Sequence, residues 1–302
     1  MLLTRDPDAF LDAAPRTGKV PHVRGLLMVR PDGFRLSDQS IKDNRYMKRG
    51  TVDPTLAKSQ HAAVVEALET AGYAIEVVPG DPACPEACFL NNAFATTERG
   101  AIYGSLRHVD RAEEPRRPLV RKRLDSLGYN TVGDLSGEAE VIAELTGSLI
   151  IDHARNVGFL GMSERVNQPG AERMAELFGL EAILQFDLTS AEYHTNTVLA
   201  VLPGKGAVIA SDGFADPAIP QAIADFYDDS VVWLTPSQKR HFAANLLALD
   251  GKHVAMSAAA AEALGEAGLG FIRAQGYTPL IVPIGEIEKG GGSIRCLLCE
   301  LW

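Results

Sequence analysis

The stretch QHAAVVEALETAGYAIEVV, residues 60–78, contains one complete structural unit. Its apolar residues recur at the three- and four-residue spacing of a helix as far as Ala71. Gly72 then interrupts the pattern, and a short apolar run follows from Ile75 to Val78. Glycine commonly ends a helix because it adopts the left-handed backbone conformation without a steric penalty. The stretch therefore predicts a helix, a glycine stop and a strand.

The same order of helix, stop and strand recurs along the chain, which indicates a repeated architecture. A Gly-Tyr pair stands between helix and strand at residues 72–73, 128–129 and 276–277. With the first stretch, the chain contains five such units, the other four at residues 118–135, 170–188, 218–234 (a weaker match) and 261–284.

Further strand candidates lie between these units, so strands outnumber helices. They are short apolar runs at residues 24–31, 147–152, 157–162, 197–203, 206–211 and 252–257. This differs from the one-to-one alternation of a doubly wound nucleotide fold, and neither G-x-G-x-x-G after a strand nor a phosphate-binding G-K-[ST] loop is present. We therefore expect five strand-rich α/β units around a common centre. Polar residues at the inner strand ends would converge there on a central pocket.

Composition excludes several classes of function. The 302 residues carry a net charge of -10, so no broad cationic surface for nucleic acid or anionic lipid is expected. The first residues lack the apolar core of a signal peptide, and no apolar run approaches the roughly 20 residues that span a bilayer. The sequence thus predicts a soluble cytoplasmic protein that acts on a small molecule, and it leaves open whether the chain forms a homo-oligomer.

The segment EIEKGGGSIRCLLCELW, residues 286–302, places three glycines shortly before Cys296. Glycines allow a backbone to approach a ligand closely, which favours Cys296 as a nucleophile. The alternative is that Cys296 and Cys299 lie on a buried final strand. A dithiol redox site is disfavoured because no helix follows the C-x-x-C motif. A structural zinc site is a further alternative, with Cys84, Cys88, Cys296 and Cys299 as ligands.

A thiolate nucleophile needs a proton-transfer partner, and His194 is the best placed of seven histidines. It stands where the polar residues before it give way to the apolar run of 197–203. Asn91 and Asn92 lie in a strongly apolar setting, as does Glu144 a few residues before Ser148. Buried amides and carboxylates need polar partners, so these side chains are expected to face a polar group.

Several motifs in order resemble the guanidine-modifying pentein superfamily, and the match covers nearly the whole chain. The likeness is greatest to its dimethylarginine dimethylaminohydrolase, arginine dihydrolase and citrulline hydrolase branches. The motifs are DNRYM, CFLNNAFAT, LRHVDRAEEP, ELTGSLIID, GMSERVN, EYHTNTVLAVL, FAANLLAL and KGGGSIRC.

The resemblance implies a five-bladed α/β propeller with pseudo-fivefold repeats around a central pocket, formed by residues 1–302 as a single catalytic domain. It implies that Cys296 is the nucleophile, that His194 is the general acid and base, and that Glu144 holds the reacting nitrogen and orients His194. Arg107 and Arg165 would bind a substrate carboxylate, since a guanidinium pairs with it bidentately. The residues that would contact the substrate are Asn44, Asn92, Arg107, Ser148, Arg165, Asn196, Asn245 and Gly291.

The implied reaction is covalent hydrolysis of a C–N bond in a guanidino or ureido group, without a metal or organic cofactor. The substrate would be arginine-like: dimethylarginine, arginine or citrulline. This chain has Asn92, Ser148 and Asn196 where many relatives have aspartate. The resulting loss of negative charge adds a neutral ureido substrate, such as citrulline, to the arginine-like candidates. An amidinotransferase and a zinc-stabilised binding protein are the alternatives.

Overall fold

Helix α2 (Pro54–Thr70) and strand β3 (Ile75–Val78) show how the repeated unit forms. Asp53 caps the helix, because its side chain accepts hydrogen bonds from the backbone of Thr55 and Leu56. The buried face of α2 follows helical spacing and contains Ala57, His61, Val64 and Leu68. Gly72 then has a φ of 95°, and Gly128 and Gly276 have φ of 90° and 82° at the same place in their units. The predicted glycine stops are thus confirmed.

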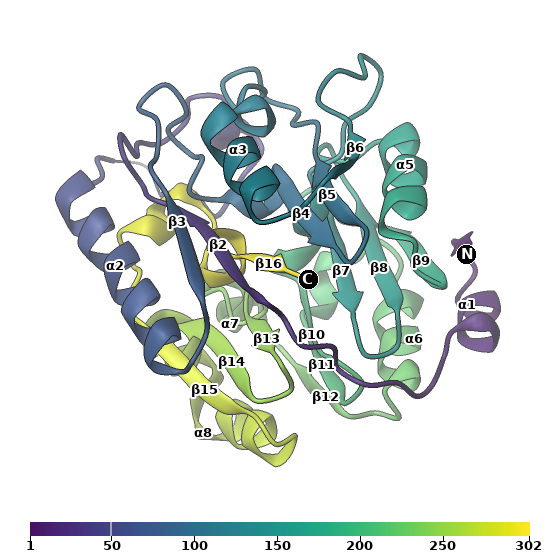
Figure 1. Ribbon diagram of the computed structural model, residues 1–302. Coiled ribbons are helices and arrows are strands. Elements are labelled where there is room, and N and C mark those ends of the chain that lie inside the picture. Colours follow the sequence, from purple (N-terminus) through teal and green to yellow (C-terminus); the bar gives the residue numbers. More distant parts are fainter. Residues whose placement is uncertain (49) are drawn as a thin grey trace.

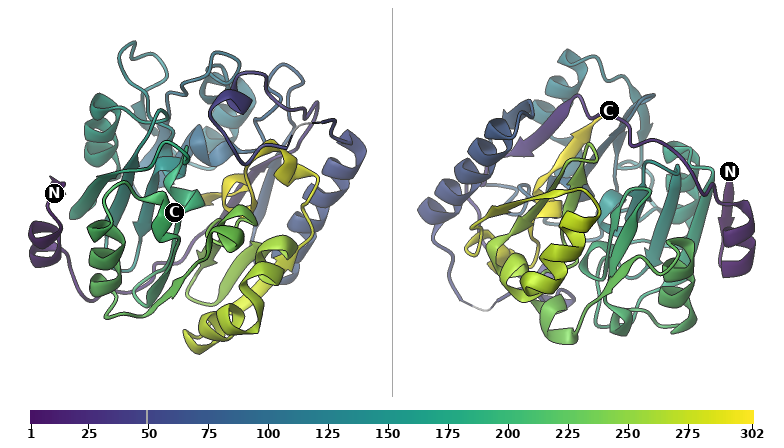
Figure 2. Two further views of the ribbon diagram at one scale, coloured as in Figure 1. Left: turned by 180° about the vertical axis from the view of Figure 1, so that it is seen from behind. Right: turned by 90° about the horizontal axis from the view of Figure 1, so that it is seen from below.

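The computed structural model describes residues 1–48 and 50–302, which form a mixed α/β fold (Figure 1). The strands lie toward the middle of the molecule and the longer helices lie around them (Figures 1 and 2). In the described residues the strands make five open sheets. The four-stranded sheet has the spatial order β1 (Leu2–Thr4), β9 (Ala182–Asp187), β8 (Val157–Met162) and β7 (Leu149–Asp152). Two of the three-stranded sheets have the orders β10 (Leu199–Leu202), β11 (Gly206–Ile209), β12 (Val231–Trp233) and β13 (Leu247–Leu249), β14 (His253–Ser257), β15 (Thr278–Val282). The other two have the orders β16 (Cys299–Leu301), β2 (Gly25–Val29), β3 and β4 (Phe94–Thr97), β5 (Gly100–Tyr103), β6 (Thr131–Asp134).

Each sheet contains an antiparallel pair followed by a parallel strand. The helix between the second and third strands makes the parallel crossover possible. These crossover helices are α2, α3 (Pro118–Ser126), α5 (Gln168–Phe178), α6 (Ala218–Phe226) and α8 (Ala258–Ala274), and the remaining helices are α1 (Pro7–Ala13), α4 (Leu145–Ser148) and α7 (Pro236–Arg240).

Short helical turns precede the first strand of most units. The 3-10 turn η2 (Leu90–Asn92) leads into β4, and α4 leads into β7. In the same way η4 (Thr195–Thr197) leads into β10, and η7 (Ile294–Leu297) leads toward β16. The other 3-10 turns are η1 (Ser40–Lys42), η3 (Glu114–Arg116), η5 (Ser211–Gly213) and η6 (Ile287–Gly290).

The five sheets match the five units expected from the sequence. The strand-to-strand hydrogen bonds of the described residues do not join the five sheets into a closed ring, so the five-bladed propeller stays a prediction. The alternative that a final strand carries both Cys296 and Cys299 was wrong for Cys296: β16 begins only at Cys299, and Cys296 lies in the turn η7. The cause is that Ser293 and Arg295 accept turn-type hydrogen bonds from the backbones of Cys296 and Leu298.

Candidate active site

Cys296 is a buried thiol surrounded by amides. Its side chain lies in η7 with a residue exposure of 1%. The amide nitrogens of Asn196 and Asn245 each donate to its Sγ over 3.5 Å. Burial raises the pKa of the Cys296 thiol, and hydrogen bonds from the Ser293 backbone and from Asn245 offset only part of this effect. The thiol is therefore neutral near pH 7 in the free protein.

His194 and Glu144 form a fully buried pair. The imidazole Nε2 lies 2.8 Å from Oε2 of Glu144, which orients the ring. Burial lowers the pKa of His194, and the carboxylate of Glu144 opposes this shift without cancelling it. Within the described part of the chain, the other ring nitrogen, Nδ1, has no hydrogen-bond partner. Nδ1 is thus the atom of His194 that is available for proton transfer.

The edge of His194 that carries Nδ1 lies close to Gly147 and Asn92. A Cβ built on Gly147 would lie 2.9 Å from Nδ1 of His194 and 2.5 Å from Oδ1 of Asn92. A larger residue than glycine would therefore collide with both groups. Oδ1 of Asn92 is also buried and lacks a hydrogen-bond partner among the described residues. Both of these unpaired polar atoms thus lie close to the Cβ position of Gly147.

Arg165 connects Glu144 to Asp43. Its Nη1 lies 3.2 Å from Oε2 of Glu144, and its Nη2 pairs with Asp43. Burial alone would raise the pKa of Glu144, but Arg165 and His194 outweigh it and hold the pKa well below 4.5. Burial also opposes ionisation of Asp43, yet His108 and Arg165 lower its pKa to about 2. Both carboxylates are therefore ionised near neutral pH.

A small cavity of about 10 Å³ lies beside Cys296. Its walls come from the segment before α2, from η2 and from the glycines that precede η7. Asn44, Asn92 and Arg165 were expected in this site from the sequence, and they do line it with Cys296. The other lining residues are Ser40, Glu86, Phe89, Arg111, Tyr193, Gly290 and Gly292.

Gly291 shows why the glycines before Cys296 are needed. Its φ is 80°, and its carbonyl oxygen accepts hydrogen bonds from Asn44 Nδ2 and from the Tyr193 hydroxyl. A Cβ on Gly291 would lie 2.7 Å from Cγ of Met47, so a side chain cannot fit. The close packing around Gly291 holds the start of η7 against the cavity.

Seven of the predicted site residues do not line the cavity beside Cys296: Glu144, His194, Asn196, Asn245, Gly291, Arg107 and Ser148. Arg107 donates its backbone N–H to Glu144 Oε1 at 3.2 Å, but its side chain is 37% exposed and pairs with Glu164. The hydroxyl of Ser148 is fully buried and has no partner in the described ranges, and it does not line the cavity beside Cys296. The roles of both residues stay predictions.

Sequence reasoning missed Glu86 and Arg111, which both line the cavity. Oε2 of Glu86 accepts a hydrogen bond from Ser40 at 2.7 Å, and the Arg111 guanidinium pairs with Glu114 at 2.8 Å. Asp43 was also missed, although it belongs to the motif DNRYM. Asp43 and Arg111 lie within the quoted motifs DNRYM and LRHVDRAEEP, which was the available signal, whereas Glu86 lies outside the quoted motifs.

The comparisons with known proteins identify the family. Residues 30–302 match the family described as N,N dimethylarginine dimethylhydrolase, eukaryotic. The chain belongs to this dimethylhydrolase family. This membership confirms the predicted resemblance and the predicted enzyme class, a hydrolase of C–N bonds in amidino compounds.

Two curated relatives of the dimethylhydrolase family are similar over nearly the whole chain. Both are described as N(G),N(G)-dimethylarginine dimethylaminohydrolase. The protein from Mycobacterium tuberculosis is 26% identical, over 96% of this chain and 91% of its own. The protein from Streptomyces coelicolor is 26% identical, over 91% of this chain and 96% of its own.

Solved structures share the fold at lower identity. The N-terminal domain of ArgZ, a cyanobacterial arginine dihydrolase, has a TM-score of 0.78 at 16% identity, and the match covers 91% of this chain and 97% of that domain. The dimethylarginine dimethylaminohydrolase of Pseudomonas aeruginosa has a TM-score of 0.72 at 20% identity, with coverages of 93% and 100%. These likenesses confirm a mixed α/β fold of the predicted kind.

The alternative zinc site finds no support in the geometry. Across residues 1–48 and 50–302, no group of three or more His, Cys, Asp or Glu side chains is placed to hold a metal ion. All four cysteines are buried thiols, free of disulfide bonds. In the same ranges, no helix is both long and apolar enough to cross a membrane.

Proposed function

We propose that this protein hydrolyses a C–N bond in the guanidino group of an arginine-like small molecule. Residues 1–302 would form one catalytic domain with Cys296 as its nucleophile. Family membership supports this proposal. The Mycobacterium tuberculosis relative is described as a dimethylarginine dimethylaminohydrolase, and the structural neighbour ArgZ is described as an arginine dihydrolase. An ArgZ domain has also been crystallised while covalently bonded to a reaction intermediate, which is what a nucleophilic cysteine would produce.

The observation that carries the proposal is the placement of charge around Cys296. One cavity contains a buried thiol, an acidic side chain in Glu86, and the guanidinium groups of Arg111 and Arg165. Next to it stands the Glu144–His194 pair. A nucleophile, an oriented proton carrier and groups of both charges suit an amino acid that ends in a guanidinium.

The protonation states indicate how the reaction would begin. Cys296 and His194 are both neutral in the free protein, because burial disfavours their charged forms. A bound guanidinium cation favours the thiolate, since a nearby positive charge lowers the pKa of a thiol. The thiol proton would then pass to Nδ1 of His194, and the Cys296 sulfur would attack the guanidino carbon.

His194 would next return the proton to the departing amine as the C–N bond breaks, which leaves a thiouronium-type adduct on Cys296. Water, deprotonated by the same imidazole, would add to the adduct carbon and displace the sulfur. The second step restores the thiol and releases a ureido product. Glu144 would stabilise the imidazolium that forms in each half of the reaction. Asn196 and Asn245 would hold the sulfur in place through their amides.

Glu86 changes the expected preference among substrates. From the sequence, Asn92, Ser148 and Asn196 in place of aspartates added a neutral ureido substrate to the arginine-like candidates. Glu86 lies in the cavity as an acidic side chain. Burial raises its pKa, and Arg111 and Ser40 offset only part of that shift. Its carboxyl group adds a hydrogen-bond acceptor for the N–H groups of a guanidino compound, so we propose arginine or a methylated arginine ahead of citrulline.

A substrate panel tests the proposal directly. Purified protein would be incubated with arginine, dimethylarginine and citrulline, and ammonia, dimethylamine and ureido products would be measured. We expect turnover of a guanidino substrate that is lost in Cys296→Ser. Failure to turn over any guanidino compound in this panel would contradict the proposed function.

The amidinotransferase alternative is separated by an added amine acceptor. A transferase would form a new guanidino compound on the acceptor, while a hydrolase gives the same ureido product with or without it. The distinction depends on whether water or an amine reaches the adduct carbon. Product analysis by mass spectrometry distinguishes the two outcomes.

A further inference from the structure

A second cavity, the Trp302 pocket, lies apart from the Cys296 site. It has a volume of about 370 Å³ and is lined by, among others, Glu98, Ile151, His153, Asn156, Phe178 and Trp302. Small-molecule sites commonly begin at about 300 Å³, so an amino acid fits. In the part of the chain that the structure describes, this pocket shares no lining residue with the cavity at Cys296.

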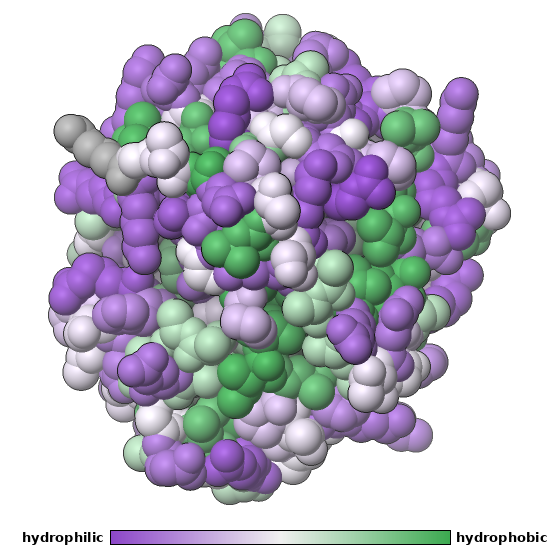
Figure 3. Space-filling model, turned by 90° about the vertical axis from the view of Figure 1, so that its left-hand side faces the viewer, coloured by the Kyte–Doolittle hydropathy of each residue, from purple (hydrophilic) through white to green (hydrophobic). Residues whose placement is uncertain are grey.

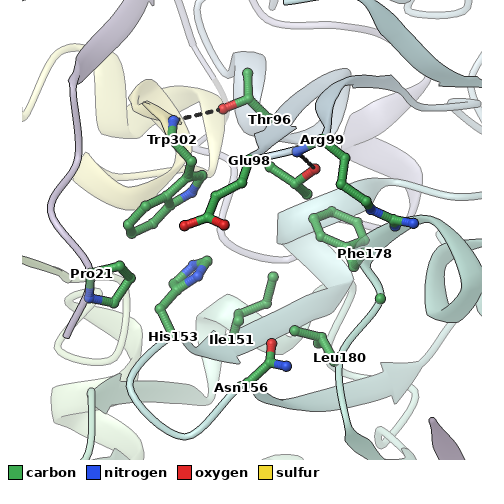
Figure 4. A pocket seen from close by; sticks show the side chains of 12 residues that line it. Pro21, Thr96, Glu98, Arg99, Ile151, His153, Asn156, Phe178, Leu180 and Trp302 are labelled. Atoms are coloured by element: carbon green, nitrogen blue, oxygen red, sulfur yellow. Dashed lines mark hydrogen bonds between the residues drawn. The ribbon is translucent and has the colours of Figure 1, made fainter. Parts of the chain in front are cut away.

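Aromatic side chains form much of its wall. The His153 ring packs on the Trp302 indole, with centroids 4.1 Å apart and an angle of 34° between the planes. Figure 4 shows this pair on one side of the pocket, with Phe178 on the other. Aromatic faces attract planar cations through the negative charge of their π-systems. The pocket thus provides surface on which a flat cation can lie.

Three polar side chains that line the pocket, Glu98, His153 and Asn156, offer hydrogen-bond acceptors. Glu98 is exposed, and its carboxylate lies beside the stacked Trp302 and His153 rings, while the side chain of Asn156 lies on the far side of His153 from Trp302 (Figure 4). Burial lowers the pKa of His153 to about 3, so its ring is neutral at pH 7 and offers one acceptor nitrogen. A ligand with several N–H donors and a positive charge matches these three groups.

Arg99, the cationic residue in this wall, does not compensate the charge of Glu98. Its Nη2 donates to the carbonyl oxygens of Glu176, at 3.2 Å, and Leu177. Figure 4 shows its guanidinium on the Phe178 side, away from Glu98. The negative charge of Glu98 is therefore open to a bound cation.

We propose that the Trp302 pocket binds a small planar organic cation of the guanidinium type. The cation lies against the aromatic wall and donates hydrogen bonds to Glu98, Asn156 and His153. This site is independent of the reaction at Cys296, and its existence does not rest on the proposed function.

Intrinsic fluorescence provides the test, because the chain contains 2 tryptophans. A Trp233→Phe background leaves Trp302 as the sole indole reporter. Methylguanidinium is titrated into this protein, and methylurea, which is neutral and of similar shape, is titrated in parallel at matched ionic strength. We expect a saturable change in Trp302 fluorescence with methylguanidinium only.

Glu98→Gln in the same background should weaken the apparent affinity about two- to fivefold, because the charge-assisted contact of an exposed carboxylate is lost. Glu66→Gln, an exposed site on α2 with the same change in charge, is the matched control and should leave the affinity unchanged. An unsaturable response, an equal response to methylurea, or unchanged affinity in Glu98→Gln would overturn the proposal.

Discussion

Cys296 and Cys299 are both buried, yet their surroundings differ. Cys296 contacts two amides and lines the cavity, whereas Cys299 belongs to β16 and donates to the carbonyl of Glu300 at 3.8 Å. Burial raises the pKa of Cys299 to about 12, and the charge of Glu300 adds to this effect. Position in the chain does not distinguish the two thiols, but the groups around each sulfur do.

Cys296→Ser should therefore abolish turnover, by roughly a thousandfold or more, because a serine hydroxyl is a far weaker nucleophile than a thiol. Cys299→Ser should keep most of the activity and lose stability instead. The measurements are kcat with the best substrate of the panel and the midpoint of thermal unfolding. Equal loss of kcat in the two folded variants would contradict the assignment of Cys296.

Glu144→Gln should change the dependence of kcat/KM on pH. Burial lowers the pKa of His194, and the negative charge of Glu144 raises it again in part. Without that charge the pKa of His194 falls further, so the acid limb of the profile should move to lower pH. The maximal rate should also fall, by about ten- to a hundredfold, because the imidazolium is less stabilised.

The pH profile of the wild-type protein is the reference, and its two limbs belong to the coupled pair of Cys296 and His194. An acid limb that moved to higher pH in Glu144→Gln would show that another group controls it. Circular dichroism of the variant at each pH separates a kinetic change from unfolding.

At the scale of elements, the site is assembled from equivalent turns. Asn92 ends η2, Ser148 ends α4, and Asn196 lies in η4, each just before the first strand of its unit. Asn245 precedes β13, and Cys296 lies in η7 shortly before β16. Each unit thus carries one polar residue at an equivalent position, shortly before its first strand.

The sequence predicted the parts of this arrangement that depend on local pattern. Helical spacing and Gly72 were sufficient to define the unit, and the apolar runs located strands such as β8 and β14. The turn that contains Cys296 was not predicted, because an apolar run does not distinguish a buried 3-10 turn from a strand.

Contacts between segments that are far apart in the chain could not be predicted from the sequence. Glu86 lines the cavity together with Ser40, which donates a hydrogen bond to it and lies 46 positions away in the sequence. Arg165 pairs with Asp43 across 122 positions. Spacing along the chain carries no information on either pairing, since both depend on how separate units approach one another.

The segment 43–48 is held in place by contacts with two other parts of the site. Asn44 donates to the carbonyl of Gly291 at 3.3 Å, and the backbone of Lys48 donates to Lys289 at 3.0 Å. The Tyr46 hydroxyl donates to Glu192, which lies two residues before His194. Burial and the nearby Glu192 hold the pKa of Tyr46 well above 10, so this donor stays protonated.

Tyr46→Phe should therefore loosen the segment that carries Asp43 and Asn44. We expect KM to rise about fivefold with little change in kcat, and the free energy of unfolding to fall by about 1 kcal/mol for the lost hydrogen bond. Tyr73→Phe is the matched control, because its hydroxyl bonds His253 at 2.8 Å outside the site. It should cost similar stability and leave KM unchanged. An equal rise of KM in both variants would refute a specific role for Tyr46.

At the scale of the whole molecule, strands from both ends of the sequence share a sheet. β16 pairs antiparallel with β2, with Cys299 opposite Leu27, so the last unit depends on residues far apart in the chain. Figure 3 shows apolar patches among hydrophilic residues on one face. The patches alone do not identify a partner, and homo-oligomerisation and a cytoplasmic location stay predictions.

If residues 1–302 form a single domain, two tryptophans in different parts of the fold should report the same unfolding transition. Trp233 lies in β12 and Trp302 directly follows β16, so each tryptophan reports on a different sheet. Leu27→Ala in β2 removes a fully buried side chain and should destabilise the fold by about 2–5 kcal/mol. In one cooperative domain, the midpoint of denaturant unfolding should fall equally for both reporters.

The experiment uses Trp233→Phe and Trp302→Phe backgrounds, each with and without Leu27→Ala. Leu202→Ala in β10, which is also fully buried, perturbs the other sheet and serves as the reciprocal variant. Because site residues such as His194 and Cys296 come from different units, activity should be lost over the same denaturant range. If Leu27→Ala moved the Trp302 transition and left the Trp233 transition in place, the two sheets would unfold separately and the single-domain proposal would fail.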